Sequence, residues 1–324
     1  MDAIVLNLYL NILCLKIFNS IDEFEPRRRT MVTLGTFDGV HIGHRKIVDR
    51  LIQHAFDEDC ESLILTFFPH PRMVLQDATD IKLLNTIDER AALLKDAGLD
   101  SLIIHPFDKA FSRLTADEFV NEILVKKLNV KKIIIGHDHR FGRNRTASID
   151  DLVKFGIEYG FEVEQISARE VNDVSVSSTK IRNALIDGNI ALANEYLGYE
   201  YMLNGIVVRG KQLGRTIGFP TANLKITEDY KLIPKDGVYV VKSLIGSEVV
   251  YGMMNIGNNP TVNGTTRSVE IFYFNFTDDI YDTKLTISIL HRLRDEQKFE
   301  SVELLKQQLH RDAADANDFI NKTK

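Results

Sequence analysis

The chain has 324 residues, of which 44% are hydrophobic and 27% are charged, the balance of an ordinary globular protein. Because one small core rarely holds a chain of this length, we expect two domains. The formal net charge of −6 argues against a general nucleic-acid binder, since no long basic run offsets it. Two cysteines imply no disulfide framework, which is typical of a reducing cytoplasm.

The first eighteen residues are apolar enough to raise the question of export. Asp2 stands where a signal peptide has its basic region, and Asn7 and Asn11 interrupt the apolar run. We therefore expect neither a signal peptide nor a membrane span. Residues 15–18 favour a strand that leads into the first domain, and residues 1–14 are either a true extension or the product of an upstream start.

A strand, a glycine turn and a helix are predicted over residues 31–55. The apolar run 31–34 precedes GTFDGVHIGH at residues 35–44, and apolar residues then recur every three or four positions. Such a turn aims backbone N–H groups and the positive end of the helix dipole at one point, and its glycines let a phosphate come close. His41 and His44 would therefore lie at an anion site.

Two other interpretations of these histidines stay open on the residues alone: a helix cap with ordinary surface polarity, or a zinc site. The zinc site lacks a third ligand at metal spacing, and Cys14 and Cys60 are the only cysteines. The pair resembles the HxGH signature of the nucleotidyltransferase superfamily. The resemblance implies that both histidines donate hydrogen bonds to the α-phosphate of ATP in the transition state. The other ATP-site residues that it implies here are Gly35, Phe37, Asp38 and Gly43.

Strand-like and helix-like segments alternate through the rest of the first half. The strand-like runs are 62–67, 101–104, 132–135 and 161–166, and the helix-like segments are 86–97 and 115–128. This alternation predicts parallel strands joined by helical crossovers, a doubly wound, Rossmann-like α/β sheet. Because ligands bind such sheets at the carboxyl ends of the strands, the histidine pair, the His70 loop and the loop 136–143 should share one rim.

The loop 136–143 would be a plain polar turn if it stood alone, but its place on the predicted rim favours a binding role. Arg140, Arg143 and Arg145 add positive charge where phosphates are expected, and Phe141 offers a flat apolar face to an aromatic ring. A metal is disfavoured, because His137, Asp138 and His139 are consecutive and cannot all point the same way. The flavin-site residues that we assign on this rim are His70, Asp138, Phe141 and Arg143.

Residues 176–182, VSSTKIR, follow the last strand and enter a helix that runs to about Asp187. An N-cap needs only one hydroxyl, so three hydroxyls followed by basic residues exceed a cap. The stretch resembles the SSTxIR element, which in nucleotidyltransferases holds the β- and γ-phosphates. The matching residues are Ser177, Ser178, Thr179 and Arg182. They would stabilise pyrophosphate as the leaving group.

The pattern changes at about residues 198–202, where we place the boundary between domains 1–200 and 201–324. Strand candidates follow at 201–209, 237–245, 248–256, 268–276 and 284–290 without intervening helices. Short strands at this spacing predict an antiparallel β-barrel. A terminal helix over 301–320, with Val302, Leu305 and Leu309 on one face, would pack against it.

Residues 205–223 combine spaced glycines with basic residues, a weak phosphate-loop signal that ordinary hairpins share. No GK[ST] follows, so this is not a Walker loop. The stretch resembles the GxVVxGxxxGRxxGFPTAN signature of riboflavin kinases, with further matches at 237–239, 255–261, Glu270 and 293–299. The resemblance implies an ATP site at Gly205, Gly210, Gly214, Arg215, Gly218, Thr221 and Asn223, flavin contacts at Arg294 and Phe299, and a general base at Glu270.

Together the motifs make residues 16–320 resemble the bacterial bifunctional riboflavin kinase/FAD synthetase family. That family phosphorylates riboflavin to FMN and then adenylylates FMN to FAD, with ATP in both steps. Magnesium is expected at each site, and the Thr221 hydroxyl and Asn223 carbonyl are hard oxygen ligands of the type it prefers. Departures from the pattern are Thr36, Ala147, Phe272 and Asn275, and they concern flavin contacts more than the reaction.

Two other functions stay open. One is an adenylyltransferase for another phosphorylated acceptor, with a second domain that only binds a regulator, and the other is a non-catalytic flavin-binding sensor. Turnover of riboflavin, ATP and magnesium into FMN and then FAD would separate them. The expected partners are ATP, riboflavin and FMN, in the cytoplasm, with no nucleic acid and no membrane.

Overall fold

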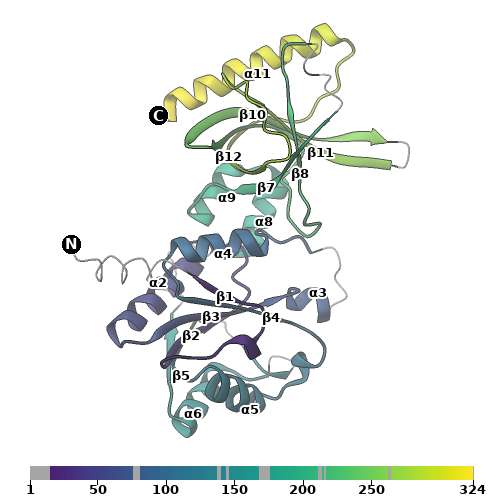
Figure 1. The fold of residues 1–324 in the computed structure, drawn as a ribbon. Coiled ribbons are helices and arrows are strands. Elements are labelled where there is room, and N and C mark those ends of the chain that lie inside the picture. The colour runs from purple at the N-terminus through teal and green to yellow at the C-terminus, as the bar shows by residue number, and fades with distance from the viewer. Residues whose placement is uncertain are drawn as a thin grey trace, which may run out of the picture. The chain divides into compact units, whose positions relative to one another are not determined.

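The structure is a computed structural model, and it describes residues 15–75, 81–136, 140–143, 146–167, 176–210, 214, 217–261 and 264–323. The chain divides into two compact units, residues 1–177 and 178–324, which are described one at a time (Figure 1). Within the described ranges, no helix combines the length and the apolar character needed to cross a membrane.

The first unit is built on a six-stranded sheet in the order β1-β4-β3-β2-β5-β6. Its strands are β1 (Lys16–Phe18), β2 (Thr30–Leu34), β3 (Glu61–Phe68), β4 (Ser101–Pro106), β5 (Val130–Gly136) and β6 (Glu162–Ile166). Every neighbouring pair is parallel, which confirms the doubly wound α/β prediction. Strands β2 and β3 are apolar runs because helices cover both faces of the sheet.

Helices lie on both faces of this sheet, with α2 and α4 on one and α5 and α6 on the other (Figure 1). The helical segments are η1 (Ile21–Glu23), α2 (Ile42–Asp57), α3 (Pro71–Leu75), α4 (Ile87–Asp96), η2 (Phe111–Arg113), α5 (Ala116–Glu118), η3 (Phe119–Lys127, a π-helix) and α6 (Ile149–Tyr159). Helix α6 was not among the helices predicted from the sequence. Its signals were present, since Ser148 and Asp151 form a capping box and Gly160 ends the helix at φ 77°.

The second unit is a closed barrel, and its described residues include the helices α8, α9 and α11. Its strands follow the order β10-β11-β8-β7-β12-β9, and the pairs are antiparallel. The strands are β7 (Met202–Val208), β8 (Ala222–Lys225), β9 (Gly237–Ile245), β10 (Glu248–Thr261), β11 (Gly264–Tyr273) and β12 (Lys284–Arg294). The helices are α8 (Ser178–Asp187), α9 (Ile190–Leu197) and α11 (Val302–Thr323). The predicted barrel and terminal helix are confirmed, and β8 is a strand that the sequence reading missed.

The face that α11 turns to the barrel differs from the predicted one at its start. Leu309, Ala313, Ala316 and Ile320 pack into the barrel's outer clusters at helical spacing. Val302 fits the same spacing but is 56% exposed. It lies in the first turn, ahead of the part of the helix that contacts core residues, so its assignment to the packed face was wrong.

Helices α8 and α9 count with the barrel as one compact unit. The backbone N–H of Lys235 donates to Leu185 O at 3.0 Å, and Asn194 Nδ2 donates to Ile289 O at 2.9 Å. The domain boundary at 198–202 stays a prediction, which can be tested with fragments.

Candidate active sites

Residues 35–44, called the histidine turn below, connect β2 to α2 through strained backbone. Gly39 has φ 93°, and two side-chain-bearing residues, Phe37 and Val40, have φ 47° and 36°. Positive φ costs energy for such residues and persists where the surroundings enforce it, often at functional sites. Gly35 still pairs with the sheet, since its N–H donates to Leu65 O at 3.2 Å.

The two histidines of the turn stack against each other at the start of α2. Their ring centroids are 3.7 Å apart with a 17° interplanar angle. His41 is the N-cap of α2, where its Nδ1 accepts a hydrogen bond from the His44 N–H at 3.3 Å. A neutral imidazole with Nδ1 as acceptor carries its proton on Nε2, so His41 keeps one N–H for a ligand. Capping and ligand binding are therefore compatible here.

Both imidazoles are neutral at pH 7. Burial lowers the pKa of His41 to about 4, although the nearby Asp38 carboxylate opposes the shift. Burial also lowers the pKa of His44 well below its ordinary value, helped by the charges of His41 and Arg90. His44 Nδ1 is buried and finds no hydrogen-bond partner among the described residues. The pair can therefore donate hydrogen bonds to an anion without carrying charge of its own.

Two side chains assigned to the ATP site are packed inside the protein instead. Asp38 is 1% exposed, and its Oδ1 accepts from the N–H groups of Leu84 at 2.9 Å and Asn85 at 3.3 Å. Phe37 is buried with its ring centroid 5.0 Å from that of His44. Both side chains pack inside the histidine turn, and their part in ATP binding stays a prediction.

The glycines assigned to this site offer backbone only. A Cβ on Gly35 would lie 3.2 Å from the ring of Phe37, and Gly43 is buried in the first turn of α2. Close packing therefore favours glycine at position 35 independently of any ligand.

The residues predicted to bind flavin at the rim of the sheet differ in their exposure to solvent. His70 follows β3, is half-buried, and accepts at Nδ1 from the Arg72 N–H at 3.1 Å. Arg143 is exposed, and Asp138 lies outside the described residues. Phe141 is 8% exposed and belongs to the core beside Phe119, with ring centroids 6.1 Å apart. Its ring is therefore not the open flat face that was expected.

An aromatic cluster that the sequence reading missed lies where β3 and β4 end. The ring centroid of Phe67 is 5.4 Å from that of Phe111 and 5.7 Å from that of Phe107, and all three rings are half-buried. His105 adds an imidazole 4.7 Å from Phe111. The rule that ligands bind at the carboxyl ends of strands would have pointed to Phe67 and Phe107.

The predicted phosphate element lies at the beginning of α8, and the division between the units runs through it. Ser177 ends the first unit, and Ser178 opens both α8 and the second unit. Thr179 is exposed, while Ser178 and Arg182 are half-buried. The first N–H groups of a helix have no intrahelical partners, so this end suits an anion.

In the barrel, Glu270 lies between two amide side chains. On β11 it is the register partner of Asn223 on β8 and of Asn255 on β10. Directly paired residues share one face of a sheet, and Val269 and Ile271 are buried on the other face, as predicted. Thr221 Oγ1 donates to Glu270 Oε2 at 3.3 Å. We call Thr221, Asn223, Asn255 and Glu270 the kinase cluster.

The glycines before the kinase cluster allow close backbone approach. A Cβ on Gly205 would lie 2.6 Å from Lys225 O, so this glycine permits the pairing of β7 with β8. A Cβ on Gly210 would overlap the side chain of Asn223, and one on Gly214 would overlap Phe219 O. Gly218 has φ 87°, and Arg215 lies outside the described residues.

The donor set of the kinase cluster fits magnesium. A hydroxyl, an amide carbonyl and one carboxylate gather on one face, and all are hard oxygen ligands. Magnesium usually takes one or two carboxylates and completes its shell with substrate phosphates and water. Thr221 and Asn223 are therefore suitable ligands for a metal that arrives with ATP.

Arg294, assigned to the flavin, is engaged by the terminal helix. Its Nε and Nη2 donate to the two carboxylate oxygens of Asp312 at 2.8 and 2.7 Å, and Asp312 is almost fully buried. This bidentate pair fastens β12 to α11, and the flavin contact of Arg294 stays a prediction. The Phe299 ring lies 5.9 Å from the Arg294 guanidinium carbon and is half-buried.

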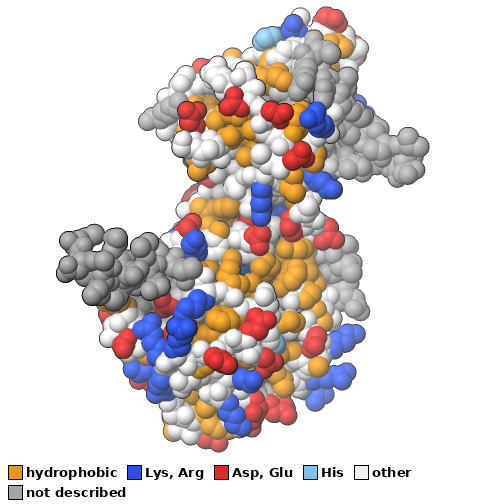
Figure 2. Space-filling view, viewed as in Figure 1, with side chains coloured by type: hydrophobic (Ala, Val, Ile, Leu, Met, Phe, Trp, Pro, Cys, Tyr) orange, Lys and Arg blue, Asp and Glu red, His pale blue; other side chains and the backbone are white. Residues whose placement is uncertain are grey.

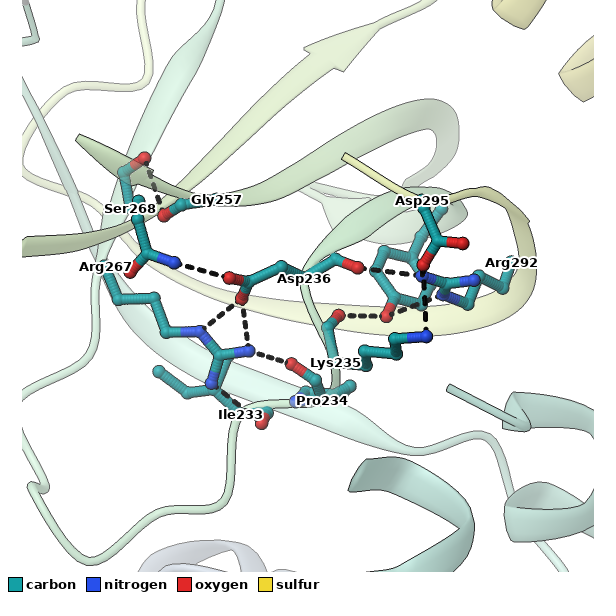
Figure 3. Close-up of polar contacts among 11 residues, drawn as sticks. Ile233, Pro234, Lys235, Asp236, Gly257, Arg267, Ser268, Arg292 and Asp295 are labelled. Atoms are coloured by element: carbon teal, nitrogen blue, oxygen red, sulfur yellow. Dashed lines mark hydrogen bonds and ion pairs between the residues drawn. The ribbon is translucent and has the colours of Figure 1, made fainter. Parts of the chain in front are cut away.

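Asp236 and Asp295 are the other acidic side chains considered for the role of base, and both are held in ion pairs (Figure 3). Asp236 accepts from Arg267 Nε at 2.7 Å, and Asp295 binds Arg292 at 2.7 Å and Lys235 at 3.1 Å. The hydrogen bond from Arg292 lowers the pKa of Asp295. Both carboxylates line a cavity of about 500 Å³ together with Lys235 and Arg267.

The face drawn in Figure 2 carries charged side chains of both signs. Acidic and basic side chains are interspersed over each unit among the described residues drawn there. A continuous basic stripe is the feature that tracks a nucleic-acid backbone.

Comparison with known proteins assigns the family. The family model for FAD synthetase matches residues 23–180, and that for riboflavin kinase matches residues 197–320. Two relatives named bifunctional riboflavin kinase/FMN adenylyltransferase are 36% identical: that of Escherichia coli K12 over 300 residues (92% of this chain, 95% of the relative) and that of Listeria monocytogenes over 303 (93% and 95%).

A solved structure of a macrolide-efflux protein from Streptococcus pneumoniae is 32% identical, covers 94% of this chain and 98% of its own, and superposes with a TM-score of 0.84. That match supports the two-part fold, while the family models and the curated relatives confirm the family predicted from the motifs. The chain therefore belongs to the bifunctional riboflavin kinase/FMN adenylyltransferase family.

Proposed function

We propose that this chain makes FMN from riboflavin and ATP at the kinase cluster, and FAD from FMN and a second ATP at the histidine turn. The observation that carries the proposal is the presence of two separate sites with the chemistry that each step needs. One is a pair of neutral imidazoles at a helix N-terminus. The other is a carboxylate set among hard oxygen ligands.

At the histidine turn, the FMN phosphate attacks the α-phosphorus of ATP and pyrophosphate leaves. His41 and His44 donate hydrogen bonds to α-phosphate oxygens as negative charge accumulates, and the start of α2 adds its dipole. Ser177, Ser178, Thr179 and Arg182 would hold the leaving pyrophosphate. Because the imidazoles are neutral, they stabilise the transition state as dipoles and need no covalent intermediate.

At the kinase cluster, the ribityl 5′-hydroxyl of riboflavin attacks the γ-phosphorus of ATP, and Glu270 accepts its proton. The hydrogen bond from Thr221 orients the carboxylate before the substrate arrives. Thr221 and Asn223 would hold magnesium, which when bound neutralises phosphate charge.

Flavin rings need flat apolar faces, and each unit has half-buried candidates. In the first unit they are Phe67, Phe107 and Phe111, beside the His70 loop, and in the second the candidate is Phe299.

The use of ATP and the absence of a disulfide framework in the sequence support a cytoplasmic location.

Two reciprocal variants test the proposal. His44→Ala should lower FAD formation by about 10²–10³ and leave FMN formation within twofold, because one preorganised donor is lost. Glu270→Gln should lower FMN formation by roughly 10²–10⁴ and leave FAD formation from supplied FMN intact. The control is Glu248→Gln, an exposed barrel carboxylate on β10, which should change neither rate.

The outcomes separate the alternatives. Loss of both activities in either folded variant would contradict two independent sites. A wild-type protein that binds flavin but makes neither product would be a sensor, and one that adenylylates another phosphorylated acceptor but not FMN would have a different substrate.

A further inference from the structure

A buried arginine lies beneath the histidine turn. Arg90, on α4, has a side chain only 2% exposed, and so does its neighbour Asp38. Arg90 Nη2 lies 3.9 Å from Asp38 Oδ1, and Arg90 Nη1 donates to Thr66 Oγ1 at 3.3 Å. Burying a guanidinium is costly, so a position that retains one calls for an explanation.

These contacts hold the histidine turn at two points. The first is Asp38 itself, which belongs to the turn. The second is indirect, because Thr66 Oγ1 accepts from Arg90 and in turn donates to Thr36 O at 3.3 Å. Thr36 and Asp38 flank Phe37, one of the residues with positive φ. The guanidinium fork therefore braces the strained part of the turn from below, which a single ammonium group does less well.

Helix α4 is also fixed to α2 itself. Arg45 Nη1 donates to Leu93 O at 3.0 Å, one turn along α4 from Arg90. Just ahead of its other end, the N–H groups of Leu84 and Asn85 donate to Asp38 Oδ1. Asp38 therefore interacts both with the N–H groups ahead of α4 and with Arg90. Its negative charge offsets the guanidinium only in part, so the positive charge of Arg90 still acts on neighbouring groups.

The positive charge of Arg90 acts on the titration of His44. The charged groups that act on the histidine pair are Asp38 from the turn and Arg90 from α4, and His41 also acts on His44. The positive charge of Arg90 disfavours protonation of His44, whereas Asp38 favours protonation of His41.

We propose that Arg90 is a positioning residue of the adenylyltransferase site. Its buried guanidinium holds the turn that carries the two histidines and places a fixed positive charge behind the groups that bind phosphate. The proposal rests on the proposed function of the histidine turn. A charge in the low-dielectric interior attracts a triphosphate and needs no reorganisation during the reaction.

The test removes the charge pair while keeping its hydrogen-bonding shape, in the double variant Arg90→Gln/Asp38→Asn. The new amide oxygen at position 38 can still accept from the Leu84 and Asn85 N–H groups, and glutamine at position 90 keeps an uncharged N–H donor on α4. FMN formation in the same chain should stay within twofold, which shows that the second unit is intact. The kcat of FAD formation should fall roughly 10- to 100-fold, because the histidines are misplaced and the fixed charge is gone.

Burial and the positive charge of Arg90 both lower the pKa of His44, so NMR of the imidazole resonances provides the second readout. In the double variant the His44 titration should move up toward its ordinary range. Asp38→Asn alone should move His41 down, because it removes the charge that favours protonation. The matched control is Arg29→Met, which removes an arginine bonded to Val130 O and Gly160 O at the opposite end of β2 and should shift neither histidine.

The outcomes distinguish a failure of the proposed function from a failure of the role of Arg90. A wild-type protein that makes no FAD would overturn the proposed function itself. A wild-type protein that makes FAD but whose His44 titrates near 6.5 would overturn the role of Arg90 even if no variant folds. Wild-type FAD turnover together with an unshifted His44 in the double variant would do the same.

Discussion

His41 should make the stability of the first unit depend on pH between 5 and 7, the range in which exposed histidines titrate. Its pKa is about 4 in the folded protein and about 6.5 when exposed. Between these values the unfolded chain binds more protons, so stability must fall as the pH falls. At pH 5 the linkage costs about 2 kcal/mol relative to pH 7, since each pKa unit corresponds to about 1.4 kcal/mol.

The variant His41→Asn isolates this contribution. Asparagine is a good N-cap and can still accept the His44 N–H, but it cannot titrate. Between pH 7 and 5 the variant should therefore lose about 2 kcal/mol less stability than the wild type. His44 shifts in the same direction and keeps some pH dependence in the variant.

The assay is hydrogen exchange in urea, read separately in peptides from α2 and from β9, so that the barrel serves as an internal reference. His291→Asn, an exposed histidine on the barrel, should leave the pH dependence in α2 unchanged. Parallel loss of α2 stability in the wild type and in His41→Asn would refute the burial argument. The carboxylates titrate lower and do not confuse this window.

Three further predictions concern the second unit. Fragment 178–324 should be more stable than fragment 201–324 by several kcal/mol in urea, because the buried apolar side chains of α9 stay with the barrel; equal stability would favour the predicted boundary. Gly205→Ala should cost about 1–3 kcal/mol in barrel unfolding and impair the kinase alone, because its methyl would lie 2.6 Å from a carbonyl oxygen of β8. Asp312→Ala should destabilise the barrel by roughly 3 kcal/mol, since it leaves Arg294 without its bidentate partner, and a shift below 1 kcal/mol in urea would contradict that role.

The order of elements and the reaction class were readable from the sequence because their signals are local. Apolar runs and periodicities mark the strands and helices, and the glycine turn with its histidines predicts an anion site wherever it stands in the chain. The alternation around Glu270 placed its side chain on the correct face, since a period of two depends only on neighbouring residues. Strand β8 escaped because its four residues are too short to show a period.

The tertiary structure decided which of the motif's side chains are exposed. Asp38 serves N–H groups about 46 positions away, Phe141 enters the core beside Phe119, and Arg294 pairs with Asp312 on a helix, 18 positions later in the chain. Such pairings depend on chain segments that meet only after folding, so a motif tells which residue types are present but not what each one touches. Arg90 could not be found from a motif at all, because it belongs to none. It meets the histidine turn only after α4 has packed there.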